Sequence, residues 1–198
     1  MDIEMVKDEL LKNPEYDNEW VESASVLISK YDVSISDIDK FCAAQLQMLV
    51  EAFKQCSDAE WFTTKLIESN LNTTQMAILI MAKTQNASDD IVKYYMDRKD
   101  IPFTKMNYCV KAEMDGLLIH ELINIDEFDA DQIYEIYAGY MENVNYKSYA
   151  KSFISAKIMN TIRTALMNGA IECKIDKNSI SFSYEEESLY NEILCNIL

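Results

Sequence analysis

The sequence has few of the residues that interrupt helices, because its 198 positions include only 3 glycines and 2 prolines. A β-rich fold of this length would need many more turn residues. The scarcity therefore argues against a sandwich or barrel and favours helices joined by short polar connections. Apolar residues make up 49% of the chain, which is enough to bury a core and excludes a wholly disordered chain.

The residues of common catalytic and metal centres are also scarce. His120 is the single histidine, and its apolar neighbours favour a place in a helix or at the edge of the core. The five cysteines are odd in number and show no C-x-x-C spacing, so no zinc or redox centre is indicated. Three isolated glycines cannot form a phosphate-binding loop. We therefore expect a protein that is not an enzyme and that has no metal or cofactor.

Long hydrophobic runs are missing as well. No apolar run approaches 18 residues, and the N-terminal segment MDIEMVKDELL is acidic and lacks the hydrophobic core of a signal peptide. The unpaired cysteine pattern fits a reducing compartment. The expectations that follow are no membrane contact and a cytoplasmic location.

Basic residues are outnumbered, with 18 Lys and Arg against 34 Asp and Glu, so the formal charge is −16. This charge opposes direct binding of nucleic acid, which requires cations against phosphates. It favours attraction to a basic surface on a partner protein. The imbalance lies at the two ends, because residues 1–60 hold 14 acids and 5 bases and residues 121–198 hold 13 acids and 6 bases. Residues 61–120 hold 7 of each.

A pattern of apolar and small residues repeats along the chain. An apolar anchor is followed by a second apolar residue three positions later and by alanine or glycine six positions later. The anchors, spaced 30, 30, 27 and 26 residues apart, are Leu46, Met76, Met106, Ile133 and Met159. The small residues are Ala52, Ala82, Ala112, Gly139 and Ala165. These spacings place the residues on one helix face, where a small side chain lets a neighbouring helix approach closely.

Other features extend the repeat. Glutamine precedes the anchor in three copies, as Gln45, Gln75 and Gln132. Asn72, Asp129 and Ser155 are residue types that cap helix N-termini. An earlier, more divergent copy is expected around Trp20, with Val26 at the small position.

The best copies resemble a known degenerate repeat. The frame F-x-x-x-Q-[MI]-x-x-I-x-x-[GA]-[LYF], seen in residues 128–150 and 159–169, resembles helical repeats of accessory proteins of mobile elements from Firmicutes. The resemblance covers roughly residues 16–170, with 31–41 similar to the linker. Most copies lack the arginine of that pattern, which only Arg163 retains. The resemblance implies a protein-binding role, including inhibition of CRISPR or restriction enzymes.

We therefore expect an all-α fold in which five to six degenerate helical repeats of about 26–30 residues form an array. The expected layout is a single domain over 1–198, with an N-terminal helix in 1–15, repeats in 16–170 and a C-terminal cap in 171–198. Average helix and connection lengths suggest about seven or eight helices. Within the cap, alternating Ile180, Phe182 and Tyr184 allow a small β-hairpin around 177–178, and 185–198 reads as a final amphipathic helix.

Acidic residues provide the candidate partner-binding set. The densest stretch contains Asp126, Glu127, Asp129, Asp131 and Glu135, and a second contains Glu15, Asp17, Glu19 and Glu22. A calcium loop starting at Asp129 is excluded, because Tyr134 and Tyr140 stand where glycine and glutamate are required. Acids at a helix N-terminus also interact favourably with the helix dipole, which is an alternative reason for the first stretch.

Two non-enzymatic functions follow. The first is an acidic inhibitor that occupies the basic nucleic-acid-binding surface of a defence enzyme, such as a CRISPR effector or a restriction enzyme. The second is a helical-repeat scaffold or adaptor that binds a protein or peptide in a groove, where linker aromatics such as Trp61, Tyr94, Tyr146 and Tyr149 would matter more. A metal-dependent hydrolase using paired carboxylates is a third and much weaker hypothesis.

Overall fold

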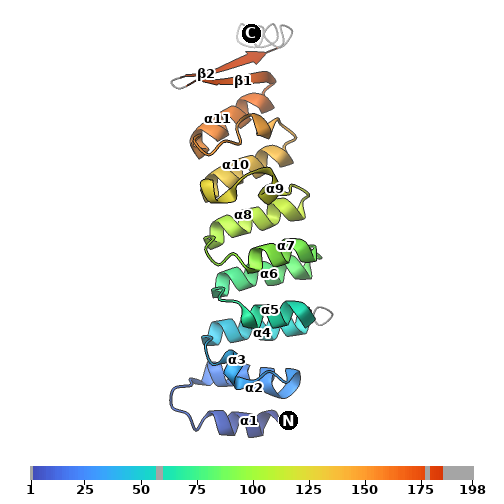
Figure 1. Ribbon diagram of the computed structural model, residues 1–198, viewed down its shortest axis with the longest axis vertical. Helices are drawn as coiled ribbons and strands as arrows, with labels where there is room; N and C mark the ends of the chain where they lie inside the picture. The colour runs from blue at the N-terminus through green and yellow to red at the C-terminus, as the bar shows by residue number, and fades with distance from the viewer. Residues whose placement is uncertain (1, 57–59, 177–178, 185–198) are drawn as a thin grey trace, which may run out of the picture. The chain divides into compact units, whose positions relative to one another are not determined.

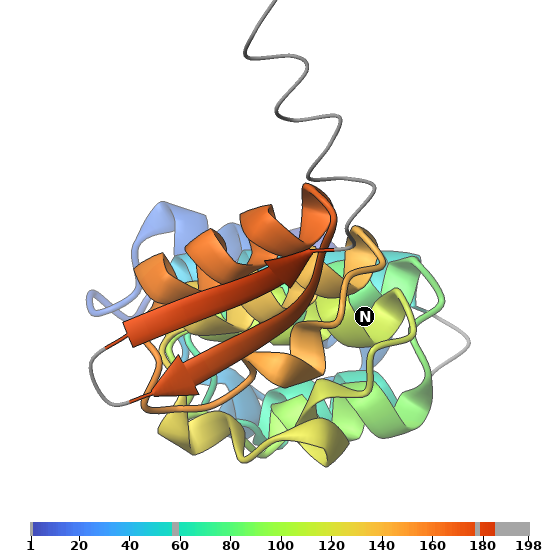
Figure 2. The same ribbon diagram turned by 90° about the horizontal axis from the view of Figure 1, so that it is seen from above.

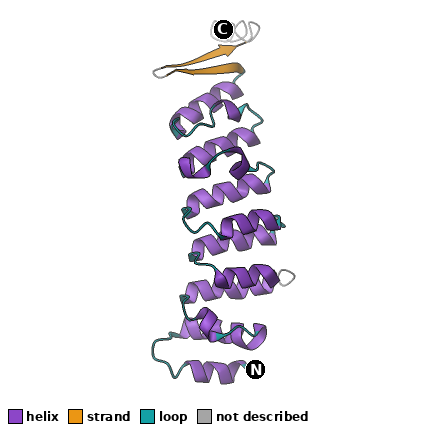
Figure 3. Ribbon diagram, viewed as in Figure 1, coloured by secondary structure: helices purple, strands orange, loops and turns teal. Residues whose placement is uncertain are grey.

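The computed structural model describes residues 2–56, 60–176 and 179–184 of the chain. Over this part the fold is predominantly helical, with one small antiparallel sheet near the C-terminal end, as expected (Figures 1 and 3). The chain contains two compact units, Met1–Met114 and Asp115–Leu198, which the expected single-domain layout does not distinguish.

The first unit is built from stacked helices. Its elements are α1 (Ile3–Leu10), α2 (Asn18–Tyr31), α3 (Ile35–Ile38), α4 (Ala43–Gln55), α5 (Glu60–Glu68), α6 (Thr73–Thr84), α7 (Asp89–Met96) and α8 (Phe103–Met114). Helices α1, α2, α4, α6 and α8 form one row, in which each packs on the next in chain order (Figure 1). The remaining helices form a second row, in which α3 contacts α5, α5 packs on α4, and α7 packs on α6 and α8.

The second unit continues the repeat with shorter connecting helices. Its elements are α9 (Ile119–Leu122), the 3-10 turns η1 (Ile125–Glu127) and η2 (Tyr146–Ser148), α10 (Ala130–Met141), α11 (Ala156–Met167), β1 (Ala170–Asp176) and β2 (Ser179–Tyr184). Helix α10 packs on α11. The two strands pair in antiparallel register, with Cys173 opposite Phe182 and Ile175 opposite Ile180, and β1 packs beside α11 (Figure 2). The expected hairpin is therefore confirmed, while the helix expected over 185–198 lies outside the described residues.

The repeat frame forms the core of both units. All five anchors, and all five apolar residues three positions after them, are fully buried. The small residues at Ala52, Ala82, Ala112 and Gly139 are buried too, whereas Ala165 is half-buried. Close helix packing at these positions is what the pattern predicts. The apolar and small positions of the repeat therefore identify the inward face of each first-row helix.

The glutamine that precedes the anchor connects neighbouring repeats. The side-chain oxygen of Gln75 accepts a hydrogen bond from the backbone N–H of Asn72, and the Asn72 side chain accepts one from the N–H of Gln75, each at 3.0 Å. The Gln75 amide then donates to the carbonyls of Lys99, at 3.2 Å, and Ile101, at 2.8 Å, in the connection to the next repeat. One buried side chain thus caps its helix and holds the following segment in place.

The same arrangement recurs with the other two glutamines. Gln45 donates to the Leu71 carbonyl at 2.8 Å. In the second unit Gln132 donates to the carbonyls of Ser152 and Ile154 at 2.9 and 2.7 Å. In the divergent first copy the Trp20 indole N–H donates to the Phe41 carbonyl at 2.9 Å. Backbone carbonyls in buried or partly buried positions between repeats gain hydrogen-bond partners in this way.

The number of helices differs from the expectation of seven or eight, because the described residues contain eleven α-helices. The additional helices arise in segments that the sequence analysis treated as polar connections. Those segments form α5 and α7, while α3 and α9 are single helical turns. Their apolar residues Phe62, Leu66 and Val92 are fully buried against the first-row helices. Each complete repeat is therefore a pair of helices.

Candidate partner-binding surfaces

Four of the predicted acids lie exposed at the beginning of α10 in the second unit. We call this set, Asp126, Glu127, Asp129 and Asp131, the η1–α10 acidic surface. Asp129 is the N-cap of α10 and accepts a hydrogen bond from the Gln132 N–H at 2.8 Å. Glu127 accepts bonds from the side chains of Asn124 and Ser152, at 3.1 and 3.2 Å. Asp131 follows in the first turn, where the helix dipole stabilises its charge.

The sequence around this surface contains many more acids than basic residues. Residues 115–146 include eight Asp and Glu and no Lys or Arg. Asp115 and Glu121, outside the named set, are also exposed. Exposed carboxylates that outnumber the neighbouring cations produce a negative potential, which solvent and salt screen. Residues 115–146 of the second unit therefore carry a net negative charge.

Glu135 is the exception among the predicted acids, and its expected place on an exposed surface is corrected by its burial. Its exposed fraction is 7%, and its carboxylate accepts hydrogen bonds from Arg163 Nε at 2.8 Å and from Asn160 Nδ2 at 3.2 Å. Arg163 also pairs with Glu142. Burial lowers the pKa of Arg163, but the hydrogen bonds with Glu142 and Glu135 outweigh it and raise that pKa above its usual value. Glu135 therefore joins α10 to α11 and is not accessible to a partner.

The second predicted set, Glu15, Asp17, Glu19 and Glu22, lies in the first unit around the start of α2, and all four side chains are exposed. Asp17 is the N-cap of α2 and accepts a hydrogen bond from the Trp20 N–H at 2.7 Å. Glu22 pairs with Lys7 of α1 at 2.9 Å. Two of the four therefore already have structural roles. The two acidic sets belong to different units, so each is a separate candidate surface.

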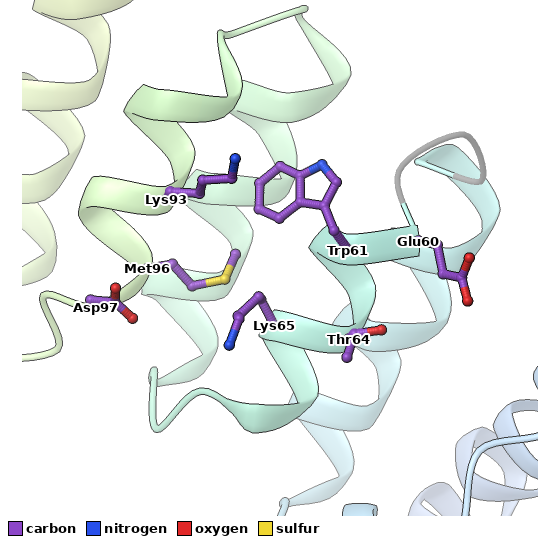
Figure 4. Close-up of a pocket in the computed structure, with 7 residues that line it drawn as sticks. All are labelled: Glu60, Trp61, Thr64, Lys65, Lys93, Met96 and Asp97. Carbon is purple, nitrogen blue, oxygen red and sulfur yellow. The ribbon is translucent and has the colours of Figure 1, made fainter.

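A groove in the first unit is lined by second-row helices α5 and α7 (Figure 4). It has a volume of about 610 Å³, with Trp61 and Met96 as its apolar walls. Its charged lining residues are Glu60, Lys65, Lys93 and Asp97. The ammonium groups of Lys93 and Lys83 lie 5.0 and 5.5 Å from the centre of a Trp61 ring, within the range of cation–π attraction. The Trp61 ring is thereby held in place beside the groove.

The other linker aromatics named for a groove differ in accessibility. Tyr94 and Tyr146 are half-buried. Tyr149 is fully buried, and its hydroxyl donates to the Glu135 carbonyl at 3.1 Å, so its expected role in a binding groove is not supported. Of the four, Trp61 is the one that lines the groove between α5 and α7. Nothing in the sequence separates Trp61 from the other three, because all occur in similar polar segments.

No group of three or more His, Cys, Asp or Glu side chains suited to holding a metal ion is found among the described residues. In the same part of the chain, no helix is both long and apolar enough to cross a membrane. Comparison of the sequence with protein-family models, and of the chain with curated proteins and solved structures, found no match.

Proposed function

We propose that this protein is a non-enzymatic, acidic, protein-binding inhibitor of a nucleic-acid-processing defence enzyme of the anti-CRISPR or antirestriction type. In this proposal the η1–α10 acidic surface occupies the basic surface on which the enzyme binds nucleic acid. The observation that carries it is the set of four exposed carboxylates within a stretch of 32 residues, 115–146, that has no Lys or Arg. The proposed targets are cytoplasmic, so the protein is expected there too.

The electrostatics support a surface of this kind. A nucleic-acid channel presents Lys and Arg to phosphates, and closely spaced carboxylates compete for the same cations. Attraction between opposite potentials accelerates association, and it weakens as salt shortens the screening length to about 8 Å at physiological ionic strength. The inhibitor should therefore bind quickly, compete with nucleic acid and lose affinity as salt increases.

The first experiment is a pull-down of the tagged protein from cells that express CRISPR nucleases and restriction enzymes, washed at low and then at high salt. A nuclease retained at low salt and released at high salt would support the proposal and identify the enzyme for an inhibition assay. In that assay added nucleic acid should relieve inhibition. Retention of proteins other than nucleases, unchanged by salt, would contradict the proposal.

A matched pair of charge reversals tests the surface itself. Asp131 and Asp90 are both exposed and both occupy the second position of a helix, α10 and α7. Asp131→Lys and Asp90→Lys thus change the net charge and the helix-dipole interaction equally. Asp131→Lys should reduce inhibition on the order of tenfold, which corresponds to about 1.4 kcal/mol, whereas Asp90→Lys should have little effect. Equal effects of the two variants would refute a specific role for the η1–α10 acidic surface.

The alternative function is a scaffold or adaptor, and the groove beside Trp61 favours it. A partially exposed tryptophan at an apolar groove is the residue type that most often dominates a protein interface. In this case binding should persist at high salt and should be lost in Trp61→Ala. Phe103→Ala is the control, because Phe103 is an aromatic residue of the same unit that is 50% exposed and does not line the groove.

A further inference from the structure

A second apolar groove lies at the N-terminal end of the first unit, and we call it the α1–α3 groove. Its volume is about 580 Å³. Its apolar lining comes from α1, from α2 and from the segment that leads into α3, and consists of Met5, Val6, Leu10, Ile28, Val33 and Ile35. Met5 is 69% exposed and Ile35 is 41% exposed. Large apolar side chains are thus presented to solvent around a concave surface, which is typical of an interaction site.

The groove occurs where the second row of helices has no counterpart in the described residues. Elsewhere in this unit α5 packs on α4, and α7 packs on both α6 and α8. Between α1 and α2 the chain forms no helix over residues 11–17, and α3 is a single turn. A helix placed in the groove would contact two consecutive first-row helices, as α7 does. The architecture of the repeat therefore favours a helix as the occupant.

The charges around the groove indicate whether the helix that binds there is acidic or basic. Among the described residues, the charged ones that line the groove are Glu9 and Asp32. Lys12 pairs with Glu9, but both side chains are about 70% exposed, so the pair offsets little of the charge. Lys7 is paired with Glu22. Residues 1–39 as a whole hold 11 acids and 3 lysines, so basic groups on a partner would meet a strongly negative surrounding surface.

We propose that the α1–α3 groove binds an amphipathic helix of a partner protein, with apolar residues on one face and Lys or Arg beside that face. A second copy of this surface is disfavoured, because two acidic rims would repel each other. This inference goes beyond the proposed inhibition through the η1–α10 acidic surface, since it concerns another unit and depends mainly on apolar burial. Either site can therefore fail its test without deciding the other.

The test measures fluorescence anisotropy of a labelled synthetic peptide of about 18 residues, with leucines along one helix face and lysines beside them. The full-length protein should bind this peptide. Met5→Lys and Ile35→Lys should each weaken binding on the order of tenfold, because each places a cation in the apolar groove. Leu11→Lys is the matched control, because Leu11 is 51% exposed, follows α1 directly and does not line the groove. Circular dichroism should show the same helix content for all three variants.

Two further peptides separate the groove from unspecific attraction of charge. A peptide of the same composition with shuffled leucines, and one with glutamates in place of the lysines, should both bind at least about tenfold more weakly. Asp32→Asn should weaken binding of the basic peptide and leave the acidic peptide unaffected or bound more tightly. The proposal is overturned if the shuffled peptide binds equally, if Leu11→Lys has the same effect as Met5→Lys, or if no peptide binds. Dimerisation that Met5→Lys abolishes would identify a second copy as the occupant instead.

Discussion

Gly139→Ala should destabilise the second unit, although alanine is normally the better helix residue. A Cβ atom at Gly139 would lie 1.8 Å from the Tyr149 hydroxyl oxygen and 3.0 Å from the Tyr146 Cβ. The ring of Tyr149 is fully buried and its hydroxyl is bonded to the Glu135 carbonyl, so the ring cannot move aside without losing that bond. Overpacking costs about 1–3 kcal/mol and loss of the buried hydrogen bond about 1–3 kcal/mol. The gain in helix propensity offsets about 1 kcal/mol of this cost, so we expect the free energy of unfolding to fall by about 1–5 kcal/mol.

A double-mutant cycle with Tyr149→Phe tests this reasoning. Phenylalanine removes the oxygen that the new Cβ would meet, leaving contacts of 3.0 and 3.1 Å that small shifts can relieve. In the Tyr149→Phe background, Gly139→Ala should therefore lower the free energy of unfolding by less than it does in the wild type. The coupling energy between the two positions should be roughly 1–3 kcal/mol. Urea unfolding followed by circular dichroism gives all four stabilities. If Gly139→Ala stabilises the protein, or costs the same in both backgrounds, the proposed steric role of glycine is refuted.

Three more predictions follow from the contacts between repeats. Gln75→Met should lower the free energy of unfolding by about 2–4 kcal/mol, because the buried Ile101 carbonyl, the partly buried Lys99 carbonyl and the N–H of the N-cap Asn72 lose their partner. In the same urea assay, Gln47→Met at an exposed position should change it by less than about 0.5 kcal/mol. Arg163→Met should lower the free energy of unfolding by about 3–5 kcal/mol, because buried Glu135 is left without its cation. The double variant with Glu135→Met should recover much of that stability, and no recovery would contradict a buried ion pair. Burial raises the pKa of the Tyr149 hydroxyl above that of an unfolded tyrosine. The stability that this shift contributes should therefore be complete below about pH 10 and should decline as the pH rises further. The melting temperature of Tyr149→Phe should decline less steeply over the same pH range.

The inward faces of the first-row helices could be predicted from the sequence, because helix periodicity is a local property. Residues three positions apart face the same side of a helix whatever they pack against, so Ile133 and Ile136 identify a buried face without knowledge of their neighbours. The capping role of Asp129 is equally local. The hairpin could also be predicted, because Ile180 and Phe182 alternate with polar residues next to a turn sequence.

The second-row helices were missed for a physical reason. Segments such as α7 are only eight residues long and rich in charge, with Asp89, Asp90 and Lys93 on one side. Isolated helices of this length are marginal, and α7 is held mainly by burying Ile91 and Val92 against its neighbours. Tertiary burial of this kind does not appear as a long periodic pattern. A short apolar stripe in a polar segment was the available indication.

The burial of Glu135 shows why counting acids does not define a binding surface. Its carboxylate lies inside the second unit because Arg163, 28 residues later, supplies a charged partner there. Without knowledge of that pairing, Glu135 could not be distinguished by sequence from Asp131, four residues earlier, which has an exposed position in the first turn of the same helix. The absence of Lys and Arg from residues 115–146 is a sounder indication, because a carboxylate in this stretch can pair with Lys or Arg only through a distant contact. Where that contact exists, as for Glu135, the acid stabilises the fold, and only acids that stay exposed, such as Asp131, can belong to the proposed binding surface.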